Sequence, residues 1–154
     1  MSIGVQYDLA GVARLQERIA KLGNLDRRAL LQQLAGVAES QTRERITSGA
    51  EKAPDGEPWQ AWTARYAATR HGNNSMLDGE GNLADSITSE IEGDEALIGS
   101  NLVYAAIHQH GGTPDMAPGP AGIPAREYLG FSQDNLDEIE TVADRWLDKH
   151  LEAA

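Results

Sequence analysis

The strongest constraint on the fold lies in residues 104–112, Tyr-Ala-Ala-Ile-His-Gln-His-Gly-Gly, and in the proline-rich stretch that follows them. The spacing predicts a short helix, because Tyr104, Ile107 and His108 are three and four residues apart and share one helical face. The double glycine at 111 and 112 ends that helix, since glycine adopts the left-handed conformation without steric cost. Four prolines follow, and none can sit inside regular structure without removing a backbone donor. The sequence therefore predicts a short helix, a stiff loop and an extended segment, Ile-Pro-Ala-Arg, that returns toward the helix. This arrangement indicates a structural element and not a reaction centre.

The length and composition fit one domain, residues 1–154, that is large enough to bury its own core. Hydrophobic residues make up 40% of the chain and charged residues 24%, which is typical of globular proteins. The chain has no cysteine, so disulfides, thiolate metal sites and cysteine nucleophiles are excluded. No apolar run reaches the ~20 residues needed to span a bilayer. The first residues also lack the features of a signal peptide, so we expect a soluble protein made in the cytoplasm.

The net charge of −11 is unevenly distributed along the chain. Residues 1–48 carry a net +2, residues 49–132 a net −8 and residues 133–154 a net −5. Phosphate binding needs clustered Lys and Arg, so specific binding of nucleic acid is not expected. The basic clusters, Arg27-Arg28 and Arg43 with Arg45, lie on one predicted helix and are candidates for contact with an acidic neighbouring subunit.

Two helices are predicted at the N-terminal end. The first begins at a cap, Asp8, and its apolar residues repeat at three- and four-residue intervals until Gly23. The second is longer, begins at Asn24 or Asp26, and ends at Gly49. The short link between them predicts an antiparallel or steeply crossed pair.

The middle of the chain has a different pattern. Residues 53–56, Ala-Pro-Asp-Gly, are typical of a turn. Trp59 and Trp62 are three residues apart, which places them on one side of a short helix running toward Ala68, and we expect both to fill the core. Residues 71–82 are polar and rich in glycine, and predict a mobile surface loop.

The last third of the chain predicts the sheet and a final helix. Ile87, Ser89 and Ile91 alternate with polar residues, which indicates a strand with one buried face. A turn at residues 92–94 and a return strand at residues 96–98 complete a hairpin. A helix begins near Ser132, with buried positions at Leu136, Ile139, Ala143, Trp146 and Leu147. The predicted fold class is α+β, with an N-terminal helix pair and a C-terminal helix packed on a small, mainly antiparallel β-sheet, and with long loops.

The sharpest chemical hypothesis is a metal site formed by His108, His110 and Asp115, with His71 as a further candidate. Histidines two apart on a helix point to different faces, and no known metal-binding spacing is present. The stronger interpretation is that His108 packs beside Tyr104 while His110 and Gln109 bond loop backbone. No serine lies in a nucleophile motif. Arg126, beside a stiff proline segment, is expected to form a bidentate pair with a carboxylate, within the subunit or across an interface.

Four groups of residues carry a resemblance to a known family. The first two are Pro54-Asp-Gly56 followed by Trp59, and Leu77-x-x-x-Gly81-x-Leu83-x-x-Ser86-Ile87. The others are Asn101-x-x-Tyr104-Ala-Ala-Ile-His-Gln-x-Gly-Gly112 and Ile123-Pro-Ala-Arg126-x-Tyr-Leu-Gly130. In order and spacing they resemble the phage virion morphogenesis (tail completion) family of Mu-like and related tailed phages, from the first helix to the last.

The resemblance implies a structural virion protein, without enzymatic activity or cofactor, that completes the tail or joins it to the head. Proteins of this kind work as rings, which implies a homo-oligomer in the neck that contacts other neck, tail or portal-side proteins while DNA passes through. The alternatives are a tail terminator or other connector ring protein, a small metal-dependent hydrolase using His108 and His110, and a DNA-binding regulator. The candidate interface residues are Arg43, Arg45, Asp55, Trp59, Tyr104, His108, Gln109, Gly111, Gly112 and Arg126.

Overall fold

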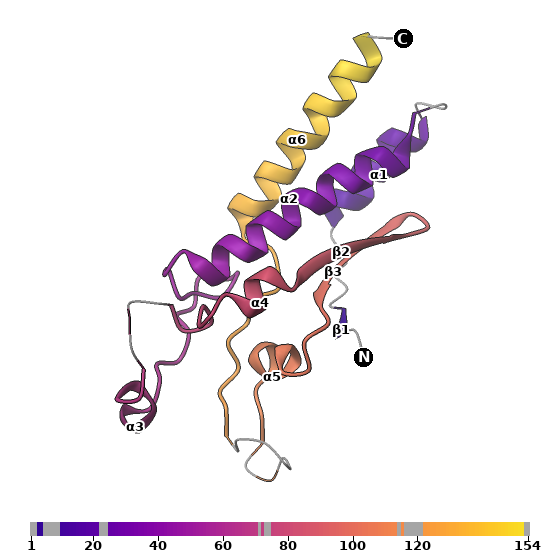
Figure 1. Ribbon diagram of the computed structural model, residues 1–154. Coiled ribbons are helices and arrows are strands. Elements are labelled where there is room, and N and C mark those ends of the chain that lie inside the picture. The colour runs from indigo at the N-terminus through magenta and orange to yellow at the C-terminus, as the bar shows by residue number, and fades with distance from the viewer. Residues whose placement is uncertain are drawn as a thin grey trace.

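The computed structural model describes residues 3–4, 10–21, 25–70, 72, 75–113, 115 and 122–152. The elements, in chain order, are β1 (Ile3–Gly4), α1 (Ala10–Lys21), α2 (Arg27–Thr47), α3 (Ala64–Ala67), α4 (Asn82–Asp85), β2 (Ile87–Glu92), β3 (Glu95–Ser100), α5 (Ala105–His110) and α6 (Gln133–Glu152). In Figure 1 the long helices α2 and α6 lie side by side above the β2–β3 hairpin, and α3 and α5 lie toward the opposite end of the molecule. The predicted α+β class is confirmed.

The ends of the long helices follow from their capping residues. Asp26 caps α2, because its Oδ1 accepts a hydrogen bond from the Ala29 N–H at 3.0 Å. Gly49, with φ 75°, follows the last turn, as predicted. Ser132 and Asn135 form a reciprocal pair before α6, each side chain accepting from the backbone N–H of the other at 3.1 Å. The cap predicted at Asp8 and the stop predicted at Gly23 lie outside the described residues.

The sheet has the order β1-β3-β2, and both pairings are antiparallel. Ile87 pairs with Ser100, and the hairpin turns through Gly93 and Asp94. Ile87 is fully buried whereas its neighbour Thr88 is exposed, so the predicted alternation is confirmed.

The core has two clusters, and α2 contributes to both. The first joins α2 to α6 through Leu30, Leu34, Ile139, Ala143, Trp146 and Leu147. The second lies beneath the C-terminal end of α2 and contains Ile46, Trp59, Leu77, Leu83, Ala84, Ile87, Ala105, Tyr128 and Leu129. Each fully buried aliphatic or aromatic side chain contributes about 1.5–3 kcal/mol, so these clusters account for most of the stabilisation. The predicted buried stripe of the final helix is confirmed at its last four positions, whereas Leu136 is half-buried.

The helix α1 packs against α6, and residues of both α1 and α2 line an open cavity, which is described below. The part of the chain that the structure describes contains no helix long and apolar enough to cross a membrane.

Two predictions for the middle of the chain are wrong. Trp59 and Trp62 do not share a helical face, because α3 begins only after Thr63, whose Oγ1 accepts from the Tyr66 N–H at 3.3 Å. Trp59 is buried, as expected, but Trp62 is half-exposed and lies outside the core. The predicted turn is confirmed by a hydrogen bond of 2.9 Å from Gly56 N–H to Ala53 O.

The segment expected to be a surface loop is partly buried. Ser75 and Leu77 are both more than nine-tenths buried, and the Ser75 hydroxyl donates to Ile46 O at 2.5 Å. The segment ends in the helical turn α4, which fills the space beside α2. Residues 71, 73 and 74 lie outside the described residues.

Candidate functional site

The residues around α5 form a short two-stranded stem. Gly112 N–H donates to Ile123 O at 2.8 Å, and Arg126 N–H donates to His108 O at 2.7 Å. Gly122 N–H donates to Thr113 O at 3.4 Å, so residues 108–113 and 122–126 run antiparallel. Figure 1 shows the two segments descending side by side from α5. The extended return predicted from the sequence is therefore the second half of a stem, and most of the intervening proline-rich loop lies outside the described residues.

Gly111 is required for this close approach. It ends α5 with φ 78°, and its N–H donates to Ile107 O at 2.7 Å. A Cβ at this position would lie 3.0 Å from Ala125 N and 3.1 Å from Ile123 O. Both the left-handed conformation and the contact with the returning backbone therefore favour glycine.

Gln109 holds the return segment against α5. Its Oε1 accepts from the N–H groups of Tyr128 and Leu129 at 3.0 and 2.9 Å. Its Nε2 donates to Leu129 O at 3.3 Å, and the side chain is 5% exposed. One amide thus satisfies three backbone groups of an irregular, buried segment, as predicted in outline for Gln109.

Three more side chains join the same segment to its surroundings. Trp59 Nε1 donates to Glu127 O at 3.0 Å, and the Tyr128 hydroxyl donates to Ala105 O at 3.0 Å. Arg126 Nε donates to Gln60 O at 2.8 Å. We call Trp59, Gln109, Arg126 and Tyr128 the return-loop clamp. Burial raises the pKa of Tyr128 to about 12, so its hydroxyl remains a donor at neutral pH.

The carboxylate pair expected for Arg126 is not formed within the described residues of the subunit. Its Nε binds a backbone carbonyl instead, and the side chain is 5% exposed. Burial lowers the pKa of the Arg126 guanidinium, while Tyr66 and Glu51 act in the opposite direction. Pairing of Arg126 across an interface stays a prediction.

His108 packs beside Tyr104, as expected. Their rings meet edge to face with centroids 5.9 Å apart, and Tyr104 is 41% exposed. Burial lowers the pKa of His108, and the charge of Arg126 adds to this effect. Among the described residues no three His, Cys, Asp or Glu side chains are grouped to hold a metal, and His71 lies outside them. The structure thus gives no support to a metal site at His108, His110 and Asp115.

The basic pair on α2 has partners inside the subunit. Arg43 binds Glu39 at 2.9 Å and Ile87 O at 2.5 Å. Arg45 Nη1 donates to Tyr128 O and Gly130 O at 2.8 and 2.9 Å, and Nη2 donates to Asn135. Their role in assembly stays a prediction, but charge reversal here would also disturb the monomer.

The remaining candidate, Asp55, is exposed in the turn before Trp59. Its Oδ1 accepts from Glu57 N–H at 3.0 Å, which stabilises the turn. Of the ten candidates, the structure brings Trp59, Gln109, Gly111, Gly112 and Arg126 together around the return segment, with His108 and Tyr104 on the adjoining helix and Arg45 behind it. Asp55 and Arg43 lie apart from this group.

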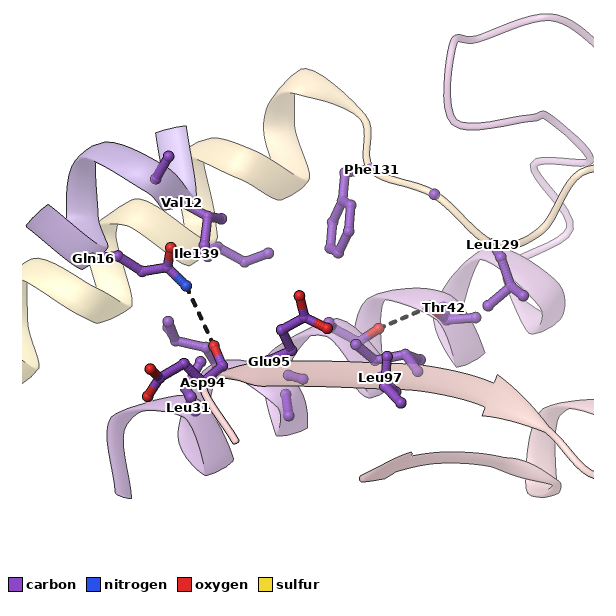
Figure 2. Close-up of a pocket in the computed structure, with 17 residues that line it drawn as sticks. Val12, Gln16, Leu31, Thr42, Asp94, Glu95, Leu97, Leu129, Phe131 and Ile139 are labelled. Atoms are coloured by element: carbon purple, nitrogen blue, oxygen red, sulfur yellow. Dashed lines mark hydrogen bonds between the residues drawn. The ribbon is translucent and has the colours of Figure 1, made fainter. Parts of the chain in front are cut away.

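Sequence reasoning missed two features. One is a row of exposed or half-exposed side chains around α3, which follow one another at four-residue spacing: Trp62, Tyr66 and Arg70. That spacing was the available signal in the sequence. The other is a cavity of about 580 Å³ between α1, α2, β3 and the start of α6. Figure 2 shows Phe131 and Glu95 extending into this space and Gln16 of α1 bonded to Asp94 O beside it.

Comparisons with known proteins identify the family. Residues 8–148 match the sequence profile of the phage virion morphogenesis family. The chain is 45% identical over 134 residues to a putative capsid assembly protein G of Escherichia phage Mu, covering 83% of this chain and 85% of the relative. It is 37% identical over 129 residues to the Mu-like prophage FluMu G protein 2 of Haemophilus influenzae, covering 83% of each. FluMu G protein 1 of the same organism is 28% identical over 152 residues, 96% of each chain.

No solved structure matches the chain. The profile match covers most of the sequence and the Mu relative covers most of its own length, so the resemblance drawn from the four residue groups is confirmed. The chain belongs to the phage virion morphogenesis family.

Proposed function

We propose that this chain is a structural virion protein that completes the tail or joins the tail to the head. It acts as a subunit of an oligomeric ring in the neck through which DNA passes. The observation that carries the proposal is its membership of the virion morphogenesis family over residues 8–148. Its location would be the virion, with the host cytoplasm as the place of assembly.

The charge distribution supports a ring that does not grip DNA. The net charge is −11, and a wall that attracts phosphate would need clustered, available Lys and Arg. Arg43 and Arg45, the main basic pair, are already bonded within the subunit. DNA that passes such a ring would slide past it without being held.

The arrangement of the signature residues supports a structural role and not an enzymatic one. The side chains of Gln109, Trp59 and Arg126 form hydrogen bonds with backbone groups of other segments. The clamp thereby fixes the shape of a projecting stem, which is what a subunit needs in order to meet its neighbours in one orientation.

Two related candidates share this physical basis. A tail terminator or another connector ring protein would use the same kind of subunit. The name of the Mu relative, a putative capsid assembly protein, favours a role on the capsid side of the joint.

The test is the fate of phage particles when the gene is disrupted, combined with the mass of the purified protein. Tail completion or head–tail joining predicts DNA-filled heads and separate tails that do not unite, and an oligomer of the purified chain. A capsid role predicts that filled heads are missing. A lone monomer that is absent from mature particles would refute the proposal, and bound stoichiometric zinc or manganese lost in His108→Ala would favour the hydrolase.

A further inference from the structure

The segment Gln60–Arg70, which we call the arm, is fixed in place but hardly buried. Each of its residues is exposed or half-exposed, and α3 within it has no buried residue. In Figure 1 α3 projects at one end of the molecule. Arg126 Nε donates to Gln60 O at one end of the arm, and at the other end the guanidinium of Arg70 lies beside Gly79.

The arm presents aromatic surface and positive charge. Trp62 and Tyr66 meet edge to face at 5.7 Å, and the guanidinium of Arg70 lies 5.0 Å from the Trp62 ring centre. Tyr66 is 48% exposed. The arm contains two arginines, Arg65 and Arg70, and no acidic residue. A group of Trp, Tyr and Arg, in which Tyr66 is exposed and the other two are half-exposed, has the composition of an interface anchor.

The other end of the molecule carries an apolar cavity with acidic residues around it. The cavity of about 580 Å³, which we call the α1–β3 groove, is lined by Val12, Ala13, Leu31, Leu34, Ala96 and Leu97 among others. Asp94 stands at its rim, Glu95 extends into it, and Glu90 and Glu92 are exposed on the adjoining strand. An apolar groove with an acidic rim is complementary to an aromatic arm with two cations.

We propose that the arm of one copy of this chain docks in the α1–β3 groove of a second copy. Tyr66 and Trp62 enter the groove, while Arg65 and Arg70 face Asp94 and the neighbouring acidic residues at the rim. This inference rests on the proposed function, since it supplies the contact between subunits of the ring.

The positions of the two surfaces fit a closed assembly. In Figure 1 the arm and the tip of the β2–β3 hairpin lie at opposite ends of the molecule. Two different complementary surfaces on one subunit produce a head-to-tail contact, which closes into a ring when the rotation between copies permits. One aromatic side chain buries about 150–250 Å², so the arm is the anchor of a larger contact and not the whole of it.

Cross-linking of the full-length chain tests the proposal, because the protein has no cysteine of its own. We would make Ala67→Cys on the arm, which keeps Tyr66, and Ala13→Cys at the groove, both at exposed positions, and treat them with a short thiol-specific cross-linker. A mixture of the two variants should give covalent dimers, while each variant alone should not. Glu140→Cys, exposed on α6, replaces Ala13→Cys in the matched control and should give none.

The outcomes separate this inference from the function on which it rests. Oligomers without the mixed cross-link, or cross-linking of Ala67→Cys with itself, overturn arm docking but leave a ring possible. A chain that stays monomeric and does not cross-link also overturns arm docking. If the protein is in addition absent from mature particles, the ring proposed as its function is refuted too. In support, Tyr66→Ala should reduce the oligomer in size-exclusion chromatography while the dilute monomer stays folded, whereas Thr69→Ala should keep the oligomer.

Discussion

The apolar cluster between α2 and α6 and the return-loop clamp bury their side chains to a similar extent but use opposite kinds of side chain. Leu30 and Leu147 between the helices are 1% and 2% exposed and offer only apolar surface. Gln109 and Arg126 in the clamp are each 5% exposed and are bonded to backbone groups of other segments. The helices satisfy their own backbone, whereas the return segment over residues 123–129 has no regular structure and depends on side chains to do so.

This difference indicates what each region demands of the sequence. The helix pair needs apolar volume at the correct spacing, which many residues supply. The clamp needs particular donor and acceptor atoms at particular places, because an unpaired buried backbone group costs about 1–3 kcal/mol. Substitutions that preserve side-chain volume but remove polar atoms should therefore lower the free energy of unfolding more in the clamp than substitutions of similar volume do between the helices.

The largest effect is expected for Gln109→Met compared with Leu30→Met. Both changes approximately conserve side-chain volume, but the first leaves two N–H groups and one carbonyl without their partner. We expect Gln109→Met to lower the free energy of unfolding by about 3–5 kcal/mol and Leu30→Met by less than about 1.5 kcal/mol. Urea unfolding followed by tryptophan fluorescence measures both. Equal losses in the two variants would mean that volume alone governs the clamp.

The next effect concerns glycine, and it compares Gly111→Ala with Gly36→Ala. At Gly111 the φ of 78° and the backbone of Ala125 oppose a side chain. At Gly36, in the middle of α2, a Cβ meets nothing within 4 Å. We expect Gly111→Ala to destabilise by about 2 kcal/mol and Gly36→Ala to stabilise by about 0.5–1 kcal/mol. Thermal unfolding of the two variants should shift in opposite directions, and a shift in the same direction would contradict the role given to Gly111.

These regions also differ in how well the sequence predicts them. The three- and four-residue spacing of Ile139, Ala143, Trp146 and Leu147 predicts a buried stripe, because an amphipathic helix repeats the same simple rule. The alternation around Ile87 predicts the strand for the same reason. Asp26 and Gly49 mark the ends of α2 through local chemistry that involves only neighbouring residues.

The contacts that define the clamp join residues far apart in the sequence, and no local pattern in the sequence predicts which residues will meet. Gln109 reaches residues 19 and 20 positions away, and Trp59 reaches Glu127, 68 positions away. The structure describes no carboxylate partner of Arg126 within the subunit for the same reason, since the carbonyl of Gln60 in a distant segment accepts from its Nε. The burial of Ser75 and Leu77 was likewise missed, because the polar composition around them hides two inward-facing side chains.

A smaller effect separates two tyrosines, one in the clamp and one in the arm. Tyr128→Phe removes the hydrogen bond to Ala105 O inside the core and should cost about 1 kcal/mol. Tyr66→Phe changes an exposed side chain and should stay within about 0.5 kcal/mol of the parent protein. Urea unfolding with matched baselines resolves this difference. A cost at Tyr66 equal to that at Tyr128 would mean that the arm is part of the folded core.

The smallest effect is a pH dependence that should arise at the edge of the clamp, where His108 lies between Tyr104 and Arg126. Burial and the charge of Arg126 lower the pKa of His108 in the folded protein, so the unfolded chain binds more protons as the pH falls. Stability should therefore be highest above the ordinary histidine pKa of 6.5 and should decrease as the pH falls through 6.5 toward the lowered value.

His108→Asn should remove part of this decrease, and the difference between variant and parent should change between about pH 8 and about pH 5. His110→Asn, on the exposed side of the same helix, controls for the loss of an imidazole. Melting temperatures across this range measure the effect. A difference in melting temperature between His108→Asn and the parent that is constant with pH would show that His108 contributes only by packing against Tyr104. Protonation of His108 would then have no effect on the stability of the clamp.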